Sequence, residues 1–343
     1  MAELQPIPDA DLAPLTTLGV AARAAWLATP ETPDALREAF AFAHERRLPT
    51  LVLGGGSNLV LASDFPGLVI RLALRGREKI GETADAHLVR VAAGEVWHET
   101  VEWTLAQGWP GLENLALIPG CVGAAPIQNI GAYGMELTER FASLEALDTR
   151  TGQVLVLDRE ACRFGYRDSL FKRPEGAGLV VLAMTFALPK RWMARANYRD
   201  VAEELAAAGV AEPAPRNIFD AVVSVRRRKL PDPAELGNVG SFFKNPVVPA
   251  AQAAALHERF PELVGYPQAD GSVKLAAGWL IDRAGWKGQQ LGRAGVHARQ
   301  ALVLVNLGGA TGGEVLTLAS RIRADVEQKF GILLEQEPIT IGA

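Results

Sequence analysis

Two loops composed mainly of small residues could bind a phosphate group. The longer loop, residues 119–134, has the sequence PGCVGAAPIQNIGAYG, so most of its positions carry almost no side chain. The shorter loop, GGGSN at residues 54–58, follows an apolar run at residues 50–53 that predicts a buried strand. Successive backbone N–H groups in such loops form concavities that bind anions, phosphates above all.

Either loop alone could instead be a crossover where two elements pack closely. The shorter loop also matches neither common nucleotide motif, because it lacks the third glycine of the dinucleotide fingerprint and the Gly-Lys-Ser/Thr of a Walker loop. The presence of two such loops favours one ligand that has a pyrophosphate and a flat body.

Several polar residues lie in aromatic or apolar surroundings. Ser241 lies in GSFFKNP at residues 240–246, Arg167 in FGYRDS at residues 164–169, and Glu337 near the chain end. Ser241 lacks the Gly-x-Ser-x-Gly elbow of an esterase nucleophile. For each of them a surface turn or a buried ion pair is the alternative to a catalytic role.

The densest positive run is Arg-Arg-Arg-Lys at residues 226–229. It could be a solvated helix end, where cations suit the negative pole of the helix dipole. It could also supply one or two side chains that bind phosphates.

Composition narrows the class of protein. The chain has 343 residues, 49% of them hydrophobic and 22% charged, which is ordinary for a globular enzyme of two or three domains. The net charge of −4 argues against nucleic acid as a partner. We expect no membrane span and no signal peptide, and therefore a cytoplasmic protein whose two cysteines are reduced. The scattered histidines and cysteines predict no metal site.

The elements that must position these residues are helices and strands in alternation. Thr32 and Pro33 predict a helix start, and Gly108 a helix end. Apolar periodicity predicts helices at residues 33–43, 97–107, 200–208, 217–228, 250–260, 276–283 and 314–330. Apolar runs predict strands at residues 50–53, 68–70, 88–91, 144–147, 154–157, 179–188 and 301–305.

Long motifs in this chain resemble those of the UDP-N-acetylenolpyruvoylglucosamine reductase (MurB) family, in the same order and over nearly the whole length. They are GGGSNLV, PGCVGAAPIQNIGAYG, FGYRDSLFK, RRRKLPDP, GSFFKNP, YPQADGSVKLAAGWLID and VHARQALVLVN. The segments around Tyr198 and Tyr266 look like the type I form, which closes a tyrosine-bearing loop over its substrate. One departure is visible: Gln336 stands where the family usually has proline, although the spacing still aligns Glu337 with the catalytic glutamate.

The resemblance implies an α+β fold: a two-part FAD-binding domain of the PCMH (vanillyl-alcohol-oxidase-like) type, at residues 1–70 and 71–215, and a C-terminal α+β substrate-binding domain at residues 216–343. It implies non-covalent FAD, reduced by NADPH, which passes hydride to UDP-N-acetylglucosamine enolpyruvate. The product would be UDP-N-acetylmuramate for peptidoglycan, and hence for cell wall growth, cell shape and division. We expect the chain to act as a monomer.

The resemblance also implies roles for individual residues. Arg167 and Glu337 would meet the substrate carboxylate, with the glutamate protonated or sharing a proton, and Ser241 would donate the proton that quenches the enolate. FAD would contact Gly54, Gly55, Gly56, Ser57, Asn58, Pro119, Gly120, Gly123, Ala124, Gln128, Asn129, Gly131 and Tyr133. The substrate would contact Tyr166, Tyr198, Lys229, Asn245, Tyr266, Lys287 and Gln300.

Two other classes fit part of these observations. One is another flavin oxidoreductase of the same fold, acting on a carbohydrate or an alcohol. The other is a non-catalytic protein that binds a UDP-sugar. A yellow colour would exclude the plain binding protein, and bleaching by NADPH would exclude the oxidase.

Overall fold

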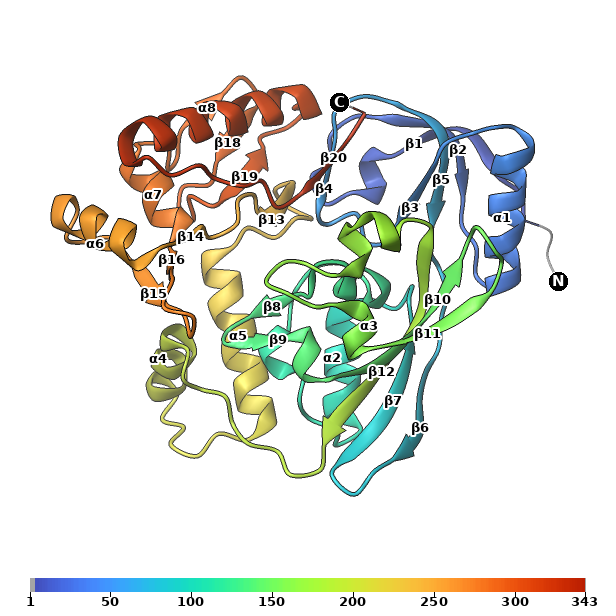
Figure 1. The fold of residues 1–343 in the computed structure, drawn as a ribbon, viewed down its shortest axis with the longest axis horizontal. Coiled ribbons are helices and arrows are strands. Elements are labelled where there is room, and N and C mark those ends of the chain that lie inside the picture. Colours follow the sequence, from blue (N-terminus) through green and yellow to red (C-terminus); the bar gives the residue numbers. More distant parts are fainter. Residues whose placement is uncertain (1–3, 343) are drawn as a thin grey trace. The chain divides into compact units, whose positions relative to one another are not determined.

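Residues 4–342 are described by the structure, a computed structural model, and they divide into two units (Figure 1). The first unit comprises residues 4–10, 24–55 and 66–228, and the second comprises residues 11–23, 56–65 and 229–342. Helices and strands occur in both units, which confirms the α+β expectation. The three-part division at residues 70/71 and 215/216 stays a prediction.

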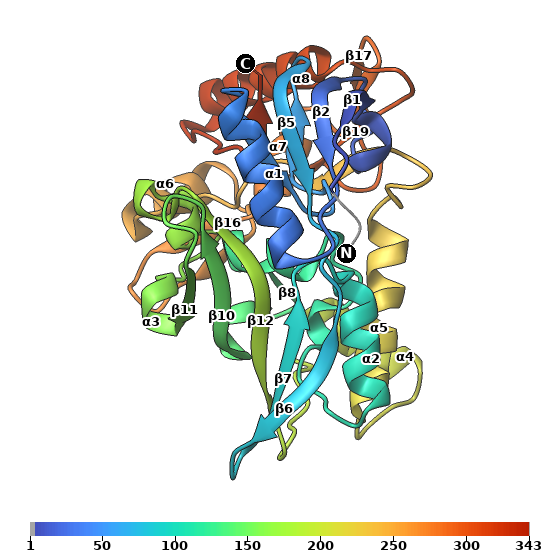
Figure 2. The same cartoon turned by 90° about the vertical axis from the view of Figure 1, so that its right-hand side faces the viewer.

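A five-stranded antiparallel sheet of order β11-β10-β12-β7-β6 is the largest layer of the first unit (Figure 2). Its central strand β12 is buried along most of its length, which explains its nearly continuous apolar sequence. The strands are β6 (Arg77–Glu82), β7 (Ala86–Ala92), β10 (Phe141–Asp148), β11 (Val154–Asp158) and β12 (Leu179–Pro189).

A second sheet of the first unit has the order β1-β2-β5-β3, with β3 and β5 parallel. Helix α1 (Pro33–Glu45) belongs to the same unit, and it begins where the Thr32 side chain accepts a hydrogen bond from the N–H of Ala35 at 3.1 Å. The strands are β1 (Ile7–Asp11), β2 (Arg23–Ala28), β3 (Thr50–Leu53) and β5 (Phe65–Arg71).

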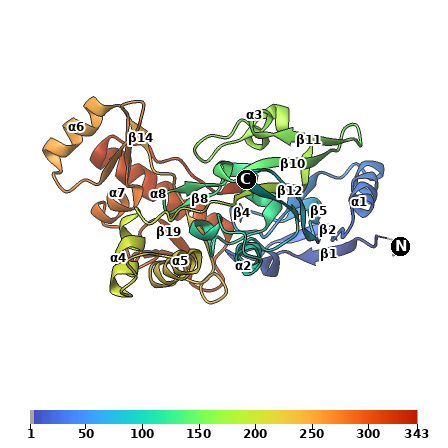
Figure 3. The ribbon, with the colours of Figure 1, turned by 90° about the horizontal axis from the view of Figure 1, so that it is seen from below.

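The remaining helices of the first unit are α2 (Trp97–Ala106), α3 (Arg159–Cys162), α4 (Arg199–Ala207) and α5 (Pro215–Lys229), the last of which ends at the unit boundary. Helices α4 and α5 lie side by side (Figure 3), and the Glu204 side chain accepts hydrogen bonds from Ser224 and Arg228. Strand β8 (Gly131–Ala132) lies within the longer glycine loop and pairs with β9 (Met135–Glu136), which directly follows the loop.

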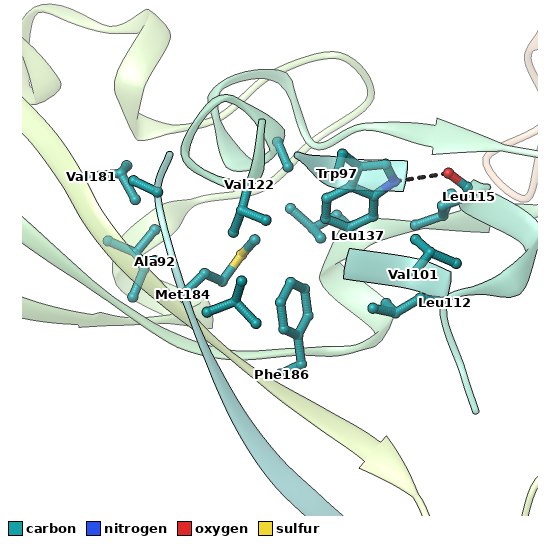
Figure 4. Packing of buried hydrophobic residues seen from close by; sticks show 14 of the residues in the cluster. Ala92, Trp97, Val101, Leu112, Leu115, Val122, Leu137, Val181, Met184 and Phe186 are labelled. Atoms are coloured by element: carbon teal, nitrogen blue, oxygen red, sulfur yellow. Dashed lines mark hydrogen bonds between the residues drawn. The ribbon is translucent and has the colours of Figure 1, made fainter. Parts of the chain in front are cut away.

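Trp97 lies at the centre of the buried core of the first unit, with 1% of its surface exposed (Figure 4). Its ring meets the ring of Phe186 edge to face, with 5.9 Å between the centroids. Its indole N–H donates to the carbonyl of Leu115 at 2.8 Å, so the one polar atom of the side chain is satisfied inside the core.

The second unit contains smaller sheets of order β13-β19-β18-β17 and β14-β16-β15, together with the parallel pair β4 and β20. Helix α8 (Gly312–Phe330) begins with a capping box between Thr311 and Glu314 and ends at Gly331, whose φ is +67°. The other elements are β4 (Leu59–Leu61), β13 (Asn238–Ser241), β14 (Val247–Val248), α6 (Ala250–Arg259), β15 (Gly265–Pro267), β16 (Val273–Leu275), α7 (Ala277–Arg283), β17 (Gln290–Leu291), β18 (Ala294–Val296), β19 (Val303–Asn306) and β20 (Ile339–Ile341).

The predicted helices and strands are present, with shifts of a few residues at their ends. Strands outside these predictions include β1, β2, β6, β13 and β20. Several of these are exposed or very short, so they lack the apolar runs on which the prediction relied.

We predict that Trp97→Phe lowers the free energy of unfolding by about 2–4 kcal/mol, because it leaves a cavity and an unpaired buried carbonyl at Leu115. Urea unfolding followed by circular dichroism measures this. Trp286→Phe is the matched control, since that indole binds the exposed Asp325 carboxylate, and it should cost less than about 1 kcal/mol. Equal losses in the two variants would contradict the central role of Trp97.

Candidate active site

Within the first unit, Gly54 and Gly55 of the shorter glycine loop pack closely against the longer loop. A Cβ atom added at Gly55 would lie 2.6 Å from the Cα of Gly120, and one added at Gly54 would lie 2.6 Å from the sulfur of Cys121. Contacts below 3.0 Å require the neighbouring atoms to move, so only glycine fits at these two positions. The close packing of these two segments therefore explains part of their glycine content. Gly55 lies beside Gly120 and is nevertheless exposed to solvent.

The segment after β7 holds the longer loop through backbone hydrogen bonds. Gly123 N–H donates to the carbonyl of Ala93 at 2.8 Å, and Val122 N–H donates to the carbonyl of Glu95 at 2.9 Å. Trp97 N–H, at the start of α2, donates to the carbonyl of Gly120 at 3.1 Å. The loop is thus fixed in place without side chains of its own.

Asn129 connects this loop to the turn that carries Arg167. It has a φ of +45°, and its side-chain amide donates to the Gly165 carbonyl at 3.1 Å and to a Glu136 carboxylate oxygen at 3.0 Å. Its side-chain oxygen accepts from the N–H of Thr138 at 3.0 Å. These three hydrogen bonds give the Asn129 side chain a structural role. Its contact with FAD stays a prediction.

Arg167 lies in a tight turn closed by the bridge between Gly165 and Asp168. Its φ is +53°, and its guanidinium donates to the carbonyl of Gly131 at 3.1 Å. The neighbouring Tyr166 ring is partly exposed, with its centroid 5.6 Å from the Arg167 guanidinium carbon. The structure thus places Arg167 against the longer glycine loop.

The cluster of four cations at residues 226–229 does not act as one group. Arg228 forms an exposed ion pair with Glu204 at 2.6 Å, and Arg227 is exposed. Arg226 is instead turned inward: burial lowers its pKa, the Tyr133 hydroxyl partly offsets this through a hydrogen bond, and the Arg167 charge lowers it further. Burial likewise raises the pKa of Tyr133.

Arg226 is a candidate site residue that the sequence prediction did not single out from its cluster. Its Nε atom is buried and has no hydrogen-bond partner among residues 4–342. Its position one turn after the buried Val222 could have indicated its inward orientation. The Arg226 guanidinium beside Tyr133 and the neighbouring charge of Arg167 form a cationic region that suits an anionic ligand.

In the second unit, Ser241 and Glu337 lie on paired segments. Glu337 N–H donates to the carbonyl of Phe242 at 2.9 Å, and Lys244 N–H donates to the carbonyl of Glu335 at 2.9 Å. Glu337 is buried, with 9% of its surface exposed. The structure therefore brings these two predicted catalytic residues close to each other along the backbone.

Asn58 of the shorter glycine loop belongs to the same region of the second unit. Its side-chain amide donates to the carbonyl of Glu337 at 3.5 Å, and its own carbonyl accepts from the N–H of Ile339 at 3.0 Å. Gln336 donates its side-chain amide to the Pro338 carbonyl at 2.7 Å and to the Thr340 hydroxyl at 2.9 Å. These bonds fix the segment that carries Glu337.

Among the predicted substrate-binding residues of the second unit, Asn245 and Gln300 lie near the same turn of α7, whereas Lys287 does not. Asn245 accepts from the N–H of Ala277 at 2.9 Å, and the Gln300 side-chain oxygen would lie 3.0 Å from a Cβ at Gly278, so both meet the first turn of α7. Lys287 lies beyond the other end of α7 and binds Asp282 at 3.0 Å.

Of the two tyrosines predicted to form a lid, Tyr198 lies directly before a helix and Tyr266 lies in a short strand. Tyr198 precedes α4 and packs its ring edge to face against Tyr133 with 5.1 Å between the centroids. Tyr266 lies in β15, where it pairs with Lys274 of β16. Both are partly exposed, and their role as a lid stays a prediction.

Curated relatives match almost the whole chain. A UDP-N-acetylenolpyruvoylglucosamine reductase of Paraburkholderia phymatum is 59% identical over 98% of this chain and 97% of its own length. One of Azoarcus sp. is 58% identical over 97% of each. The chain belongs to the UDP-N-acetylenolpyruvoylglucosamine reductase family. This confirms the resemblance seen in the motifs.

Domain and structure comparisons agree with membership of the reductase family. Residues 24–158 match an FAD binding domain, and residues 232–341 match the family's C-terminal domain. The crystal structure of UDP-N-acetylenolpyruvylglucosamine reductase (MurB) from Thermus caldophilus covers 99% of both chains at 27% identity, with a TM-score of 0.68. The predicted combination of a PCMH-type flavin domain and a C-terminal domain is confirmed.

Within residues 4–342, no helix has the length and hydropathy that crossing a bilayer requires. The same part of the chain has no group of three or more His, Cys, Asp or Glu side chains placed to hold a metal ion.

We predict that Gly55→Ala lowers the free energy of unfolding by about 1–3 kcal/mol, because the new methyl group must push the backbone of Gly120 away. Chemical denaturation measures the change. Gly81→Ala is the control, since its Cβ would meet nothing within 4 Å, and it should change stability by less than about 0.5 kcal/mol. If the two variants were equally stable, the packing of the two loops would not depend on this glycine.

Proposed function

We propose that this chain reduces UDP-N-acetylglucosamine enolpyruvate to UDP-N-acetylmuramate with NADPH as reductant and FAD as cofactor, in peptidoglycan precursor synthesis. The observation that carries the proposal is the pairing of the segments that hold Ser241 and Glu337, in a chain of the reductase family. A reductase of this class needs a proton donor and a group for the substrate carboxylate, and these two residues supply them.

The residues of the first unit suit FAD. The glycine loops allow backbone close to a pyrophosphate, and the half-buried cation Arg226, which lies beside Tyr133 and within the influence of the Arg167 charge, suits an anionic group. The unpartnered Nε of Arg226 supports the same assignment, because a buried donor is costly unless it is paired. When bound, FAD supplies the hydride that reaches the enolpyruvyl double bond.

The proton chemistry is assigned to the second unit. Hydride arrival at the terminal carbon of the enol ether leaves negative charge on the neighbouring carbon and its carboxylate. Ser241 donates a proton to that carbon through its hydroxyl group. Glu337, protonated or sharing a proton, hydrogen-bonds the carboxylate, and Arg167 offsets its charge; comparable donors contribute about 2.7–4 kcal/mol each.

The predicted substrate contacts keep their assignments within this proposal. Asn245 and Gln300, which meet at α7, are assigned to the UDP-sugar together with Tyr166, Tyr198, Lys229, Tyr266 and Lys287. A cytoplasmic location and a monomeric state remain expectations.

Flavin absorbance tests the function and the two alternatives at once. NADPH should bleach the purified yellow protein without oxygen, and UDP-N-acetylglucosamine enolpyruvate should then restore the absorbance. Bleaching by a carbohydrate or an alcohol instead would identify an oxidase of the same fold. Colourless protein that binds a UDP-sugar would identify a plain binding protein.

We predict that Ser241→Ala separates the two half-reactions. NADPH oxidation produces no substrate carbanion, so bleaching should proceed at nearly the wild-type rate. Re-oxidation by substrate should slow by about 10²-fold or more, because it loses its general acid. Stopped-flow absorbance measures both steps on one sample.

Two further variants complete the Ser241 test. Ser241→Cys keeps an ionisable proton and should recover part of the lost rate. Ser320→Ala, which removes an exposed helix hydroxyl, should leave both rates unchanged. Equal slowing of the two steps in Ser241→Ala would show that the serine is structural and that the proton comes from another group.

We predict that Tyr266→Ala weakens substrate binding by about tenfold and leaves NADPH binding unchanged, because it removes an exposed aromatic ring assigned to the substrate. Isothermal titration of each ligand measures this. Val247→Ala on β14, another exposed side chain of the same sheet, should change neither affinity. An equal loss for both ligands in Tyr266→Ala would argue against a substrate-specific role.

A further inference from the structure

The imidazole of His98 makes a hydrogen bond to the strained start of the longer glycine loop. His98 lies in the first turn of α2, and its Nδ1 accepts from the N–H of Leu117 at 3.0 Å. Leu117 has a φ of +58°, which is a left-handed conformation that costs a leucine about 1–2 kcal/mol. The segment needs an external partner to keep this conformation.

Leu117 is placed directly before the residues assigned to the flavin. It precedes Ile118, Pro119 and Gly120, and Gly120 packs on Gly55 of the shorter loop. The direction in which the chain leaves Leu117 therefore determines where Gly120 lies. Trp97 donates hydrogen bonds to the carbonyls of Leu115 and Gly120, one on each side of Leu117. His98 accepts a hydrogen bond from the N–H of Leu117 itself.

The His98 ring is held in one orientation by stacking. It lies parallel to the buried Phe219 ring of α5, with 5.4 Å between the centroids and 8° between the planes. The guanidinium of Arg216 lies 4.7 Å from the centroid of the same Phe219 ring. An acceptor at Nδ1 means that this nitrogen carries no proton, so the neutral ring has its proton on Nε2.

The surroundings of His98 favour the neutral ring. Burial lowers its pKa from 6.5; Glu102 and Glu99 on α2 oppose this, while Arg227 and Arg226 on α5 lower the pKa further. Because the pKa is lowered, the hydrogen bond is complete above about pH 6.5 and is lost only as the pH falls through the lowered pKa. Protonation would place a hydrogen on Nδ1, facing the N–H of Leu117.

We propose that His98 is a positioning residue for the flavin: its unprotonated Nδ1 fixes Leu117 and so shapes the loop at residues 118–123, which makes FAD affinity fall in acid. The inference rests on the proposed function in one respect, namely that this loop binds FAD. It assigns to His98 no contact with substrate or cofactor.

Two variants of His98 distinguish the loss of its hydrogen-bond acceptor from the loss of its aromatic ring, and a variant of His44 serves as the control. His98→Phe keeps a flat ring on Phe219 but removes the acceptor. His98→Asn places an oxygen the same number of bonds from Cα as Nδ1, accepts a hydrogen bond and does not titrate. His44→Asn is the matched control, since His44 is exposed at the end of α1.

FAD dissociation from the flavin-loaded protein is measured by flavin fluorescence between pH 8 and pH 5, with circular dichroism to confirm folding. At pH 8, His98→Phe should raise the FAD dissociation constant about tenfold, and His98→Asn should stay within about threefold of wild type. As the pH falls through the lowered pKa of His98, the wild type and His44→Asn should lose up to about tenfold in affinity relative to His98→Asn.

Two results would overturn the inference: wild-type affinity in His98→Phe at pH 8, or the wild-type pH dependence in His98→Asn. If His98→Phe does not fold, the comparison of wild type with His98→Asn still decides. Failure of the wild type to bind FAD would contradict the proposed function as well. FAD binding by the wild type, with variants that match it at every pH, would contradict only the inference about His98.

Discussion

Backbone hydrogen bonding between the end of β7, the start of α2 and residues 115–123 is the constraint on which the first unit's site depends. A loop of glycine and alanine has no side chains with which to hold itself, so its shape must come from neighbouring backbone. The bonds from Gly123 to Ala93, Val122 to Glu95 and Trp97 to Gly120 supply that shape. They join the loop to a buried strand and to the central core residue, so the loop moves only if the core moves.

In the second unit, Glu337 is positioned by backbone pairing of residues 335–337 with residues 242–244. Glu337 must lie near Ser241, and the bridge between Phe243 and Gln336 sets their spacing. The bonds beside this bridge are donated by the N–H groups of Lys244 and Glu337, so the bridge does not use the N–H of residue 336. A proline, which has no N–H, would be compatible with this backbone pairing but would lose the two hydrogen bonds that the Gln336 side chain donates. In this chain those two bonds help to fix the segment that carries Glu337.

Sequence alone predicted the regular elements and the loops well, because periodic apolar residues and clustered glycines carry local signals. It predicted Arg167, Ser241 and Glu337 only through the family motifs, since a lone polar residue has no periodicity that marks its role. It missed Arg226 as a separate site residue, because an arginine in a basic run looks solvated until the helix orientation is known. It assigned Asn129 to the flavin, which stays a prediction, and it gave no indication of the side-chain bonds to Gly165, Glu136 and Thr138. Such long-range partners leave no trace in the spacing of residues.

The charge distribution of the first unit connects ligand binding to stability. Arg226 is half-buried beside Tyr133, its Nε atom is buried, and the positive charge of Arg167 acts on it. Burying part of a cation beside another cation is costly, and the protein keeps it only if something else offsets the cost. Part of the offset comes from the Tyr133 hydroxyl, and the unpartnered Nε shows that the offset is incomplete. An anion bound there would supply the rest, and because it binds only the folded chain it would stabilise the fold by mass action.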